Sequence, residues 1–376
     1  MTDRFAIPAD QQGFVRLKER LLDTQWTDAV VDDWSQGTEF GFLTDFVRFW
    51  CTDYDWSARA CSLNLLPQFR TQIGGCGIHY LHFRSERMGA TPLMLLNGWP
   101  SSCVEYIKLV PSLLSGADPF DIVIPTMPGF GFSDRPRSPY EFEPAALFPI
   151  LMKKLGYDQF VVAGTDIGSG TATRIALNNP DRVLAVHVSA VAPKPRGERA
   201  PTEAERDYDA QVAIWQREEG GYQALQSSRP QTLAFGLADS PVGLASWILE
   251  KFRAWSDCGG DLVSVWPIEV LLDNIMIYWI TNTIGSSIRY YFDAARLRPP
   301  LKADDFVTSP TAVAMWPHDL TLAPREIADL LYNVQRYNVM PRGGHFPAWE
   351  TPELYAEDIA AAARLVAARD RGAIRE

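Results

Sequence analysis

One aspartate, Asp166, stands where a buried strand is predicted to turn sharply into a helix. The apolar run 159–163 precedes it, residues 164–169 read Gly-Thr-Asp-Ile-Gly-Ser, and the helix is predicted over 171–178. Small residues on both sides of the aspartate permit a turn tight enough to push the carboxylate outwards, as in a nucleophile elbow. Beside the positive end of a helix dipole, an ionised carboxylate can attack a saturated carbon and leave an ester on the enzyme. The structural alternative is that Asp166 only caps the helix.

A nucleophile of this kind needs a base, and the base needs an acid that orients it. His345 is the candidate base, because it alone among the 5 histidines follows a late predicted strand (337–340) and two flexible glycines. Asp319 is the candidate acid, because it comes shortly after the predicted strand 311–316, at the strand end where the partners of an elbow lie. The other acids fit less well, since they precede that strand or lie inside a predicted helix: Asp304, Asp305 and Asp329.

Backbone donors for such a site are predicted at the exit of an earlier strand, 93–96. Residues 97–100 read Asn-Gly-Trp-Pro there. The N–H groups of Trp99 and Ile167 are expected to converge near Asp166 as an oxyanion hole. Each donor of this kind contributes about 3 kcal/mol to a developing negative charge.

The elements that must position these residues alternate between short apolar strands and helical stretches. Predicted strands at 93–96, 121–125, 160–163 and 184–188 are each followed by a loop and a helical stretch, and the rhythm resumes at 311–316. Because helical crossovers cover both faces of such a sheet, the fold class is α/β with a mostly parallel sheet flanked by helices.

A Pro- and Gly-containing stretch, Ala-Pro-Lys-Pro-Arg-Gly at 192–197, interrupts this rhythm, and the next hundred residues or so read as helices. We therefore predict a helical lid inserted into one α/β core. The predicted organisation is an N-terminal extension over residues 1–90, the first part of the core over 91–192, the lid over 193–300 and the second part of the core over 301–376.

Composition excludes several classes of protein. The net charge of −11 argues against nucleic acid or an anionic membrane as a partner. The 5 cysteines are an odd number without a CxxC pair, which indicates a reduced, cytoplasmic protein. No signal peptide and no apolar run long enough to span a membrane are evident. His79 and His82, in the predicted strand 78–83, are expected at surface or edge positions, and no third ligand for a metal can be placed beside them.

The chain resembles the epoxide hydrolases of the α/β-hydrolase fold, specifically their microsomal-type branch, over nearly its whole length. Seven segments carry the resemblance: Tyr-Asp-Trp (54–56), Leu-Asn (63–64) and Leu-Pro-Gln-Phe (66–69) near the N-terminus; Gly-Tyr (221–222), Asp-Ser-Pro-Val-Gly-Leu-Ala (239–245) and Ile-Leu-Glu-Lys-Phe (248–252) in the lid; and Arg-Gly-Gly-His-Phe (342–346) near the end. By position, the resemblance implies that Asp166 is the nucleophile, Asp319 the charge-relay acid and His345 the base.

The resemblance adds two lid tyrosines that hold the epoxide oxygen and bind the substrate together with Trp99. Tyr222 matches the first and Tyr291 the second, with Tyr290 as a neighbouring alternative. One departure is notable: Asn97 stands where the family usually has histidine in a His-Gly-x-Pro turn. The donor in that turn is the Trp99 backbone, so the oxyanion hole can survive, and the family suggests a cis bond before Pro100. Mammalian relatives carry a membrane anchor, which is not expected here.

The function implied is hydrolysis of an epoxide to a vicinal diol, through an alkyl-enzyme ester that histidine-activated water hydrolyses. The partners are a small-molecule epoxide and water, and no cofactor or metal is needed. The alternatives are a haloalkane-type dehalogenase and a non-catalytic ligand-binding protein on the same scaffold. A role in secondary metabolism or detoxification is an expectation only. The substrate, the stereochemistry and the oligomeric state, a homodimer included, are left open.

Overall fold

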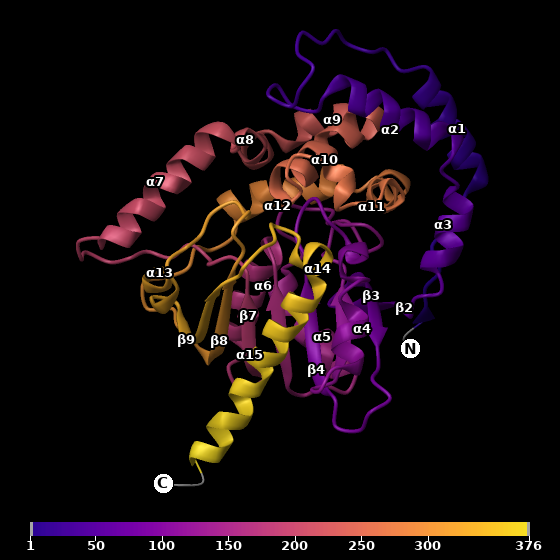
Figure 1. The fold of residues 1–376 in the computed structure, drawn as a ribbon. Helices are drawn as coiled ribbons and strands as arrows, with labels where there is room; N and C mark the ends of the chain where they lie inside the picture. Colours follow the sequence, from indigo (N-terminus) through magenta and orange to yellow (C-terminus); the bar gives the residue numbers. More distant parts are fainter. Residues whose placement is uncertain (1–2, 374–376) are drawn as a thin grey trace.

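A computed structural model describes residues 3–373 and places a nine-stranded sheet at the centre of the chain (Figure 1). The strand order is β1-β2-β3-β5-β4-β6-β7-β8-β9. The strands β5, β4, β6, β7, β8 and β9 run parallel, whereas β1, β2 and β3 continue the sheet antiparallel beyond β5. The bounds are β1 Asp3–Arg4, β2 Gln68–Ile73, β3 Cys76–Phe83, β4 Thr91–Leu96, β5 Phe120–Pro125, β6 Phe160–Gly164, β7 Val183–Val188, β8 Val307–Met315 and β9 Tyr332–Val339. The predicted mostly parallel α/β sheet is therefore confirmed.

Both faces of the sheet are buried, as alternate residues of β4 show. Leu93 and Leu95 belong to one apolar cluster and Met94 and Leu96 to another. The first cluster lies under α4 (Val110–Ser115) and α15 (Pro352–Ala373), and the second under α5 (Pro144–Lys154) and α6 (Ile167–Asn178). Period-two side chains pointing to opposite faces explain why this strand reads as one continuous apolar run.

A set of helices between β7 and β8 lies over the carboxyl ends of the parallel strands (Figure 1). These lid helices are α7 Glu203–Glu218, α8 Gly221–Ser228, α9 Pro230–Asp239, α10 Pro241–Trp255, α11 Ile268–Thr281 and α12 Ile284–Arg296, with a short η2 at Leu262–Ser264. Local signals start them: Thr202 and Glu205 form a capping box for α7, and Ser240 accepts the N–H of Gly243 at 2.9 Å at the start of α10. The smaller elements are η1 Cys103–Tyr106, α13 Arg325–Asp329 and α14 Pro347–Glu350.

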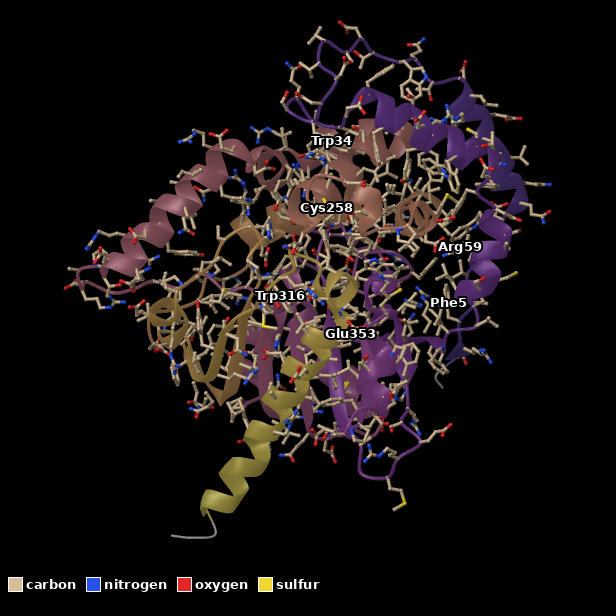
Figure 2. The ribbon with its side chains drawn as sticks, in the orientation of Figure 1. Phe5, Trp34, Arg59, Cys258, Trp316 and Glu353 are labelled. Carbon is tan, nitrogen blue, oxygen red and sulfur yellow. The ribbon has the colours of Figure 1, made fainter. Side chains whose placement is uncertain are left out.

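The N-terminal helices run alongside the lid. They are α1 Gln11–Leu22, α2 Phe40–Thr52 and α3 Trp56–Leu63. Arg59, labelled on α3 in Figure 2, forms an ion pair with Asp273 of α11, which also accepts the hydroxyl of Tyr54 at 2.9 Å. Asp273 is only 1% exposed in its side chain, so this contact joins the extension to the lid through a buried charge. The predicted unit boundaries at residues 90, 192 and 300 stay predictions.

A second buried charge network joins α15 to the sheet. Asp358 of α15 accepts from His187 Nε2 at 2.9 Å, from Arg336 Nε at 2.8 Å and from Asn338 Nδ2 at 2.7 Å. Burial would raise the pKa of Asp358, but the hydrogen bonds and charges of His187 and Arg336 lower it to about 2. The ionised carboxylate is therefore part of the folded core.

The expectation that His79 and His82 lie at surface or edge positions is wrong. His79 is fully buried, with its ring nitrogens 2.8 Å from Thr126 Oγ1 and 3.0 Å from Gln68 Oε1. His82 is also buried, with Nε2 2.9 Å from the hydroxyl of Tyr157. Burial lowers the pKa of His79 to about 3 and that of His82 to about 4, so both are neutral. The reason is that β3 is an interior strand, paired with β2 and β5.

Among residues 3–373, no helix by itself is long and apolar enough to cross a membrane; α9 and α10 meet that criterion only when taken together, and they are bent by 116°.

Candidate active site

Asp166 lies in the turn between β6 and α6, at the carboxyl edge of the sheet. Its backbone has φ 49° and ψ −128°, a conformation that residues other than glycine rarely adopt. The turn is so tight that a Cβ on Gly164 would lie 2.3 Å from the carbonyl oxygen of Gly168, and one on Gly168 would lie 2.0 Å from that of Leu96. Both glycines are therefore needed to hold Asp166 at the strained tip of the turn.

The side chain of Asp166 does not cap α6. No capping hydrogen bond links it to the first turn of the helix. Instead, Oδ1 accepts the backbone N–H of Trp99 at 3.2 Å, and Oδ2 lies 3.3 Å from His345 Nε2. The interpretation of Asp166 as a simple N-cap is thus wrong, because the carboxylate points away from the helix and towards the predicted base.

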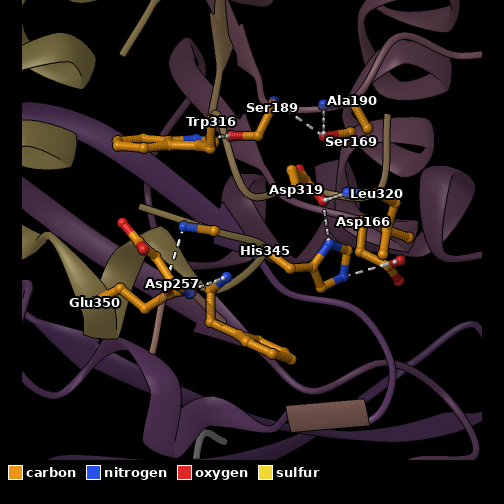
Figure 3. Close-up of polar contacts among 12 residues, drawn as sticks. Asp166, Ser169, Ser189, Ala190, Asp257, Trp316, Asp319, Leu320, His345 and Glu350 are labelled. Carbon is orange, nitrogen blue, oxygen red and sulfur yellow. Dashed lines mark hydrogen bonds and ion pairs between the residues drawn. The ribbon is translucent and has the colours of Figure 1, made fainter. Parts of the chain in front are cut away.

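Asp319, His345 and Asp166 form a continuous row, drawn in Figure 3. His345 Nδ1 lies 2.6 Å from Asp319 Oδ1, which also accepts the N–H of Leu320 at 2.7 Å. Burial alone would lower the pKa of His345, but the charge of Asp319 and the hydrogen bonds to Asp166 and Asp319 raise it well above the usual histidine range. Between two carboxylates, the imidazole is held as a cation.

The turn after β4 lies close against the Asp166 carboxylate and supplies a backbone hydrogen-bond donor to it. A Cβ on Gly98 would lie 1.9 Å from Asp166 Oδ1, so only glycine fits there. The Trp99–Pro100 peptide bond is cis. The N–H of Ile167, the first residue of α6, has no acceptor within the helix. Among the described hydrogen bonds, the backbone donor to the Asp166 carboxylate is the Trp99 N–H.

Helix α11 holds this turn in place through contacts that sequence reasoning missed. Asn274 Nδ2 donates to the carbonyl of Pro100 at 2.8 Å, and the hydroxyl of Tyr278 donates to that of Ser101 at 2.8 Å. Asn97 is buried, with Nδ2 3.1 Å from the carbonyl of Gly98. The asparagine therefore contributes to the backbone arrangement of the turn, whereas the lid determines where the turn sits.

Tyr222 of α8 and Tyr291 of α12 face each other above Trp99. Their ring centroids are 5.9 Å apart, and those of Trp99 lie 5.6 Å from Tyr222 and 6.1 Å from Tyr291. Burial raises the pKa of both phenols, and the charge of Asp166 raises each of them further. The Tyr291 hydroxyl is buried without a hydrogen-bond partner among the described residues. Both phenols are thus protonated and lie near the charge of Asp166.

Tyr290 occupies a different environment. Its ring lies 6.2 Å from that of Phe130, and the guanidinium of Arg298 lies over it at 4.6 Å. Burial raises the pKa of Tyr290, and the charges that act on it come from Arg298 and Glu143 rather than from Asp166. The geometry therefore favours Tyr291 over Tyr290 as the second donor.

Two acids near His345, Glu105 buried and Glu350 partly buried, carried no sequence signal. Glu105 of η1 is 2% exposed, and burial raises its pKa to about 7. Burial also raises the pKa of Glu350 to about 7, against three backbone N–H groups that lower it. Trp255, at the end of α10, packs its ring 5.0 Å from His345 and 5.0 Å from Tyr222. Within residues 3–373, no group of three or more His, Cys, Asp or Glu side chains is arranged to hold a metal ion.

Comparison with known proteins gives consistent matches over nearly the whole chain. Residues 2–106 match the family described as epoxide hydrolase N terminus, and residues 91–236 match the alpha/beta hydrolase fold. The chain is 38% identical over 370 residues to a protein of Stigmatella aurantiaca (strain DW4/3-1) that carries a provisional epoxide hydrolase name. This match covers 94% of this chain and 83% of that protein. It is 32% identical over 392 residues to juvenile hormone epoxide hydrolase 1 of Ctenocephalides felis, with 94% and 84% covered. The crystal structure of juvenile hormone epoxide hydrolase from the silkworm Bombyx mori matches with a TM-score of 0.90 at 28% identity, covering 98% of this chain and 96% of that one.

Proposed function

The chain belongs to the epoxide hydrolases of the α/β-hydrolase fold, and from this premise we propose that it forms a vicinal diol through a covalent ester on Asp166. The relatives support epoxide hydrolysis over dehalogenation or ligand binding alone. One observation carries the mechanism: the Asp166 carboxylate lies 3.3 Å from His345 Nε2 and close enough to two protonated tyrosines for its charge to raise the pKa of both.

In the first step, Asp166 attacks an epoxide carbon from the side opposite Tyr222 and Tyr291. The carbon–oxygen bond of the ring breaks, and its electron pair moves to an oxygen that takes a proton from a phenol. Because ester formation removes the charge of Asp166, one contribution that raises the pKa of both phenols disappears as the oxygen becomes basic. The tyrosines therefore become better acids at the moment when a proton is needed.

The same loss of charge prepares the base. With Asp166 esterified, His345 keeps one neighbouring carboxylate, Asp319, and its pKa falls. His345 releases its proton, which passes through water to the tyrosinate that gave its own proton to the epoxide oxygen. The first step therefore needs no proton from outside the site. Asp319, 2.6 Å from Nδ1, keeps the imidazole oriented with Nε2 free to accept a proton.

In the second step, His345 takes a proton from water, and the hydroxide attacks the ester carbonyl. The N–H of Trp99, with that of Ile167 as a predicted second donor, stabilises the oxyanion. The intermediate collapses as the bond between the carbonyl carbon and the ester oxygen breaks, and the leaving alkoxide takes the proton from His345. The acid left on Asp166 returns its proton to His345, which closes the cycle and releases the diol.

An isotope experiment tests this route. In a single turnover in ¹⁸O water, the label should enter Asp166 while the diol carries the original carboxylate oxygen. His345→Gln should trap the ester, visible as a protein mass increase equal to that of the substrate. Label appearing directly in the diol during the first turnover would instead show attack by water on the ring.

The aromatic side chains around Tyr222 suggest which class of epoxide the site accepts. Trp99, Trp255 and Trp215 surround Tyr222, with ring centroids 5.6, 5.0 and 6.3 Å from it. An apolar or aromatic substituent next to the ring would pack on these faces. A panel of aromatic and aliphatic epoxides, with styrene oxide as reference and Asp166→Asn as the inactive control, would rank them. Cytoplasmic location, homodimerisation and a role in detoxification or secondary metabolism stay predictions from the sequence.

A further inference from the structure

The carboxylate of Glu350, at the end of α14, binds the backbone on both sides of His345. Its Oε2 accepts the N–H of Gly344 at 2.9 Å, and its Oε1 accepts that of Phe346 at 2.8 Å. We propose that Glu350 is a positioning residue that fixes the base. All three of its described hydrogen bonds go to backbone N–H groups, so it acts through His345 rather than on the substrate.

The third hydrogen bond ties the base to the lid. Oε2 also accepts the N–H of Asp257 at 2.6 Å, just beyond α10, as Figure 3 shows. In return, Asp257 Oδ2 accepts the N–H of Gly343 at 2.9 Å, and His345 N–H donates to the carbonyl of Trp255 at 2.8 Å. The loop that carries the base is therefore fastened between α14 and the last residues of the long lid helix.

The local sequence explains why such a fastening is needed. Gly343 has φ 106°, a conformation that requires glycine, and Gly344 lies so close to the lid that a Cβ on it would be 2.4 Å from the carbonyl oxygen of Trp255. Both glycines are buried, but neither has a side chain that could anchor the loop through polar contacts. His345 must nevertheless keep its nitrogens 2.6 Å from Asp319 and 3.3 Å from Asp166. A displacement of about 1 Å typically costs about a hundredfold in rate.

This inference rests on the proposed function, because it uses the division of labour between the two steps. His345 acts as a base only when the ester is hydrolysed. A displaced imidazole therefore slows hydrolysis more than ester formation, so that kcat falls while kcat/KM, which reports ester formation, changes little. A merely structural loss would lower both parameters together, through a smaller fraction of folded enzyme.

The test is Glu350→Gln, assayed with styrene oxide by steady-state kinetics and by intact-protein mass during turnover. The amide keeps the size of the side chain but turns an NH₂ group towards one of the backbone donors. We expect kcat to fall about 10- to 100-fold, kcat/KM to stay within about threefold, and an ester to accumulate. The matched control is Glu205→Gln, in which another buried carboxylate loses its contact with a backbone N–H, that of Thr202 at 2.8 Å, in the capping box of α7. It should leave both kinetic parameters unchanged.

Two outcomes would overturn the inference: wild-type kinetics in Glu350→Gln, or an equal fall of kcat and kcat/KM without ester. His345→Gln separates this failure from that of the mechanism. If His345→Gln accumulates ester and Glu350→Gln does not, only the positioning role is lost; if neither does, the ester mechanism fails. Should Glu350→Gln not fold, Asp257→Asn is the substitute, because it weakens the hydrogen bond from the Gly343 N–H on the lid side of the same loop. It should likewise lower kcat more than kcat/KM.

Discussion

Replacing Tyr291 by phenylalanine removes one of the two hydroxyl groups proposed to donate to the epoxide oxygen and leaves the packing almost intact. The adjacent Tyr290 provides an internal control, since it lies on the same helix, is partly buried like Tyr291, and faces Phe130 and Arg298 instead of Trp99. Two substitutions of identical chemistry at neighbouring positions therefore differ in their relation to the reacting oxygen.

The expected size of the effect follows from the charge on that oxygen. A hydrogen bond to a charged group contributes about 1.5–3 kcal/mol. With a tenfold change in rate per about 1.4 kcal/mol, Tyr291→Phe should slow ester formation about 10- to 150-fold. The loss stays in this range because Tyr222, whose ring centroid is 5.9 Å away, still donates. Tyr290→Phe should change the rate by less than about twofold, because its hydroxyl does not face the nucleophile.

The assay is the single-turnover rate of ester formation, followed by rapid quench and protein mass with enzyme in excess over styrene oxide. Tyr222→Phe should behave like Tyr291→Phe, with ester formation slowed and ester hydrolysis nearly unchanged. If Tyr290→Phe slows the step as much as or more than Tyr291→Phe, the assignment of the second donor is wrong and the reasoning from ring contacts fails.

Three further outcomes are expected from the described contacts. Gly98→Ala should lower activity at least about a hundredfold with an unchanged circular dichroism spectrum, because the new Cβ would lie 1.9 Å from the Asp166 oxygen; an active variant would refute the close approach. Asp358→Asn should cost about 2 kcal/mol in urea unfolding at neutral pH. Because the pKa of Asp358 is lowered to about 2 from an unfolded value near 3.8, this contribution is complete above about pH 4 and is lost as the pH falls through about 2, so the variant and the wild type should converge there. Arg59→Met should cost about 3 kcal/mol, since it leaves the charge of Asp273 buried, and an unchanged unfolding midpoint would count against that network.

The position of Asp166 at a sharp turn could be predicted from the sequence because the geometry of that turn is local. The strand, the small residues at 164 and 168 and the helix that follows all lie within about 20 residues, and the close approaches of Gly164 and Gly168 are the physical content of that pattern. His345 and Asp319 required only the further rule that parallel strands end at the same edge of the sheet. The distance of 2.6 Å between His345 Nδ1 and Asp319 Oδ1 shows that the two loops meet at that edge.

The parts that could not be predicted depend on contacts between distant segments. The pattern of 78–83 is compatible with an edge or an interior strand, and only the pairing of β3 with β2 and β5 places His79 in the core. Glu350 is one of many acids in the sequence, and its role becomes evident only where the end of α10 passes the loop of His345. The sequence likewise could not decide whether Tyr290 or Tyr291 is the second proposed donor. The structure distinguishes them because the ring of Tyr291 contacts Trp99, whereas that of Tyr290 contacts Phe130.

In the proposed mechanism, the carboxylate at the elbow does more than replace a serine as nucleophile, because its charge also influences where protons reside. While Asp166 is ionised, it contributes to the raised pKa of His345 and of both tyrosines. A serine at the same turn would carry no such charge, so His345 would lose one of its two anionic neighbours and would be a base from the start. In the proposed mechanism, esterification of Asp166 produces this change only as the ring opens. The order of the two steps is therefore built into the charge of one side chain, and a neutral residue there could not impose it even with every distance preserved.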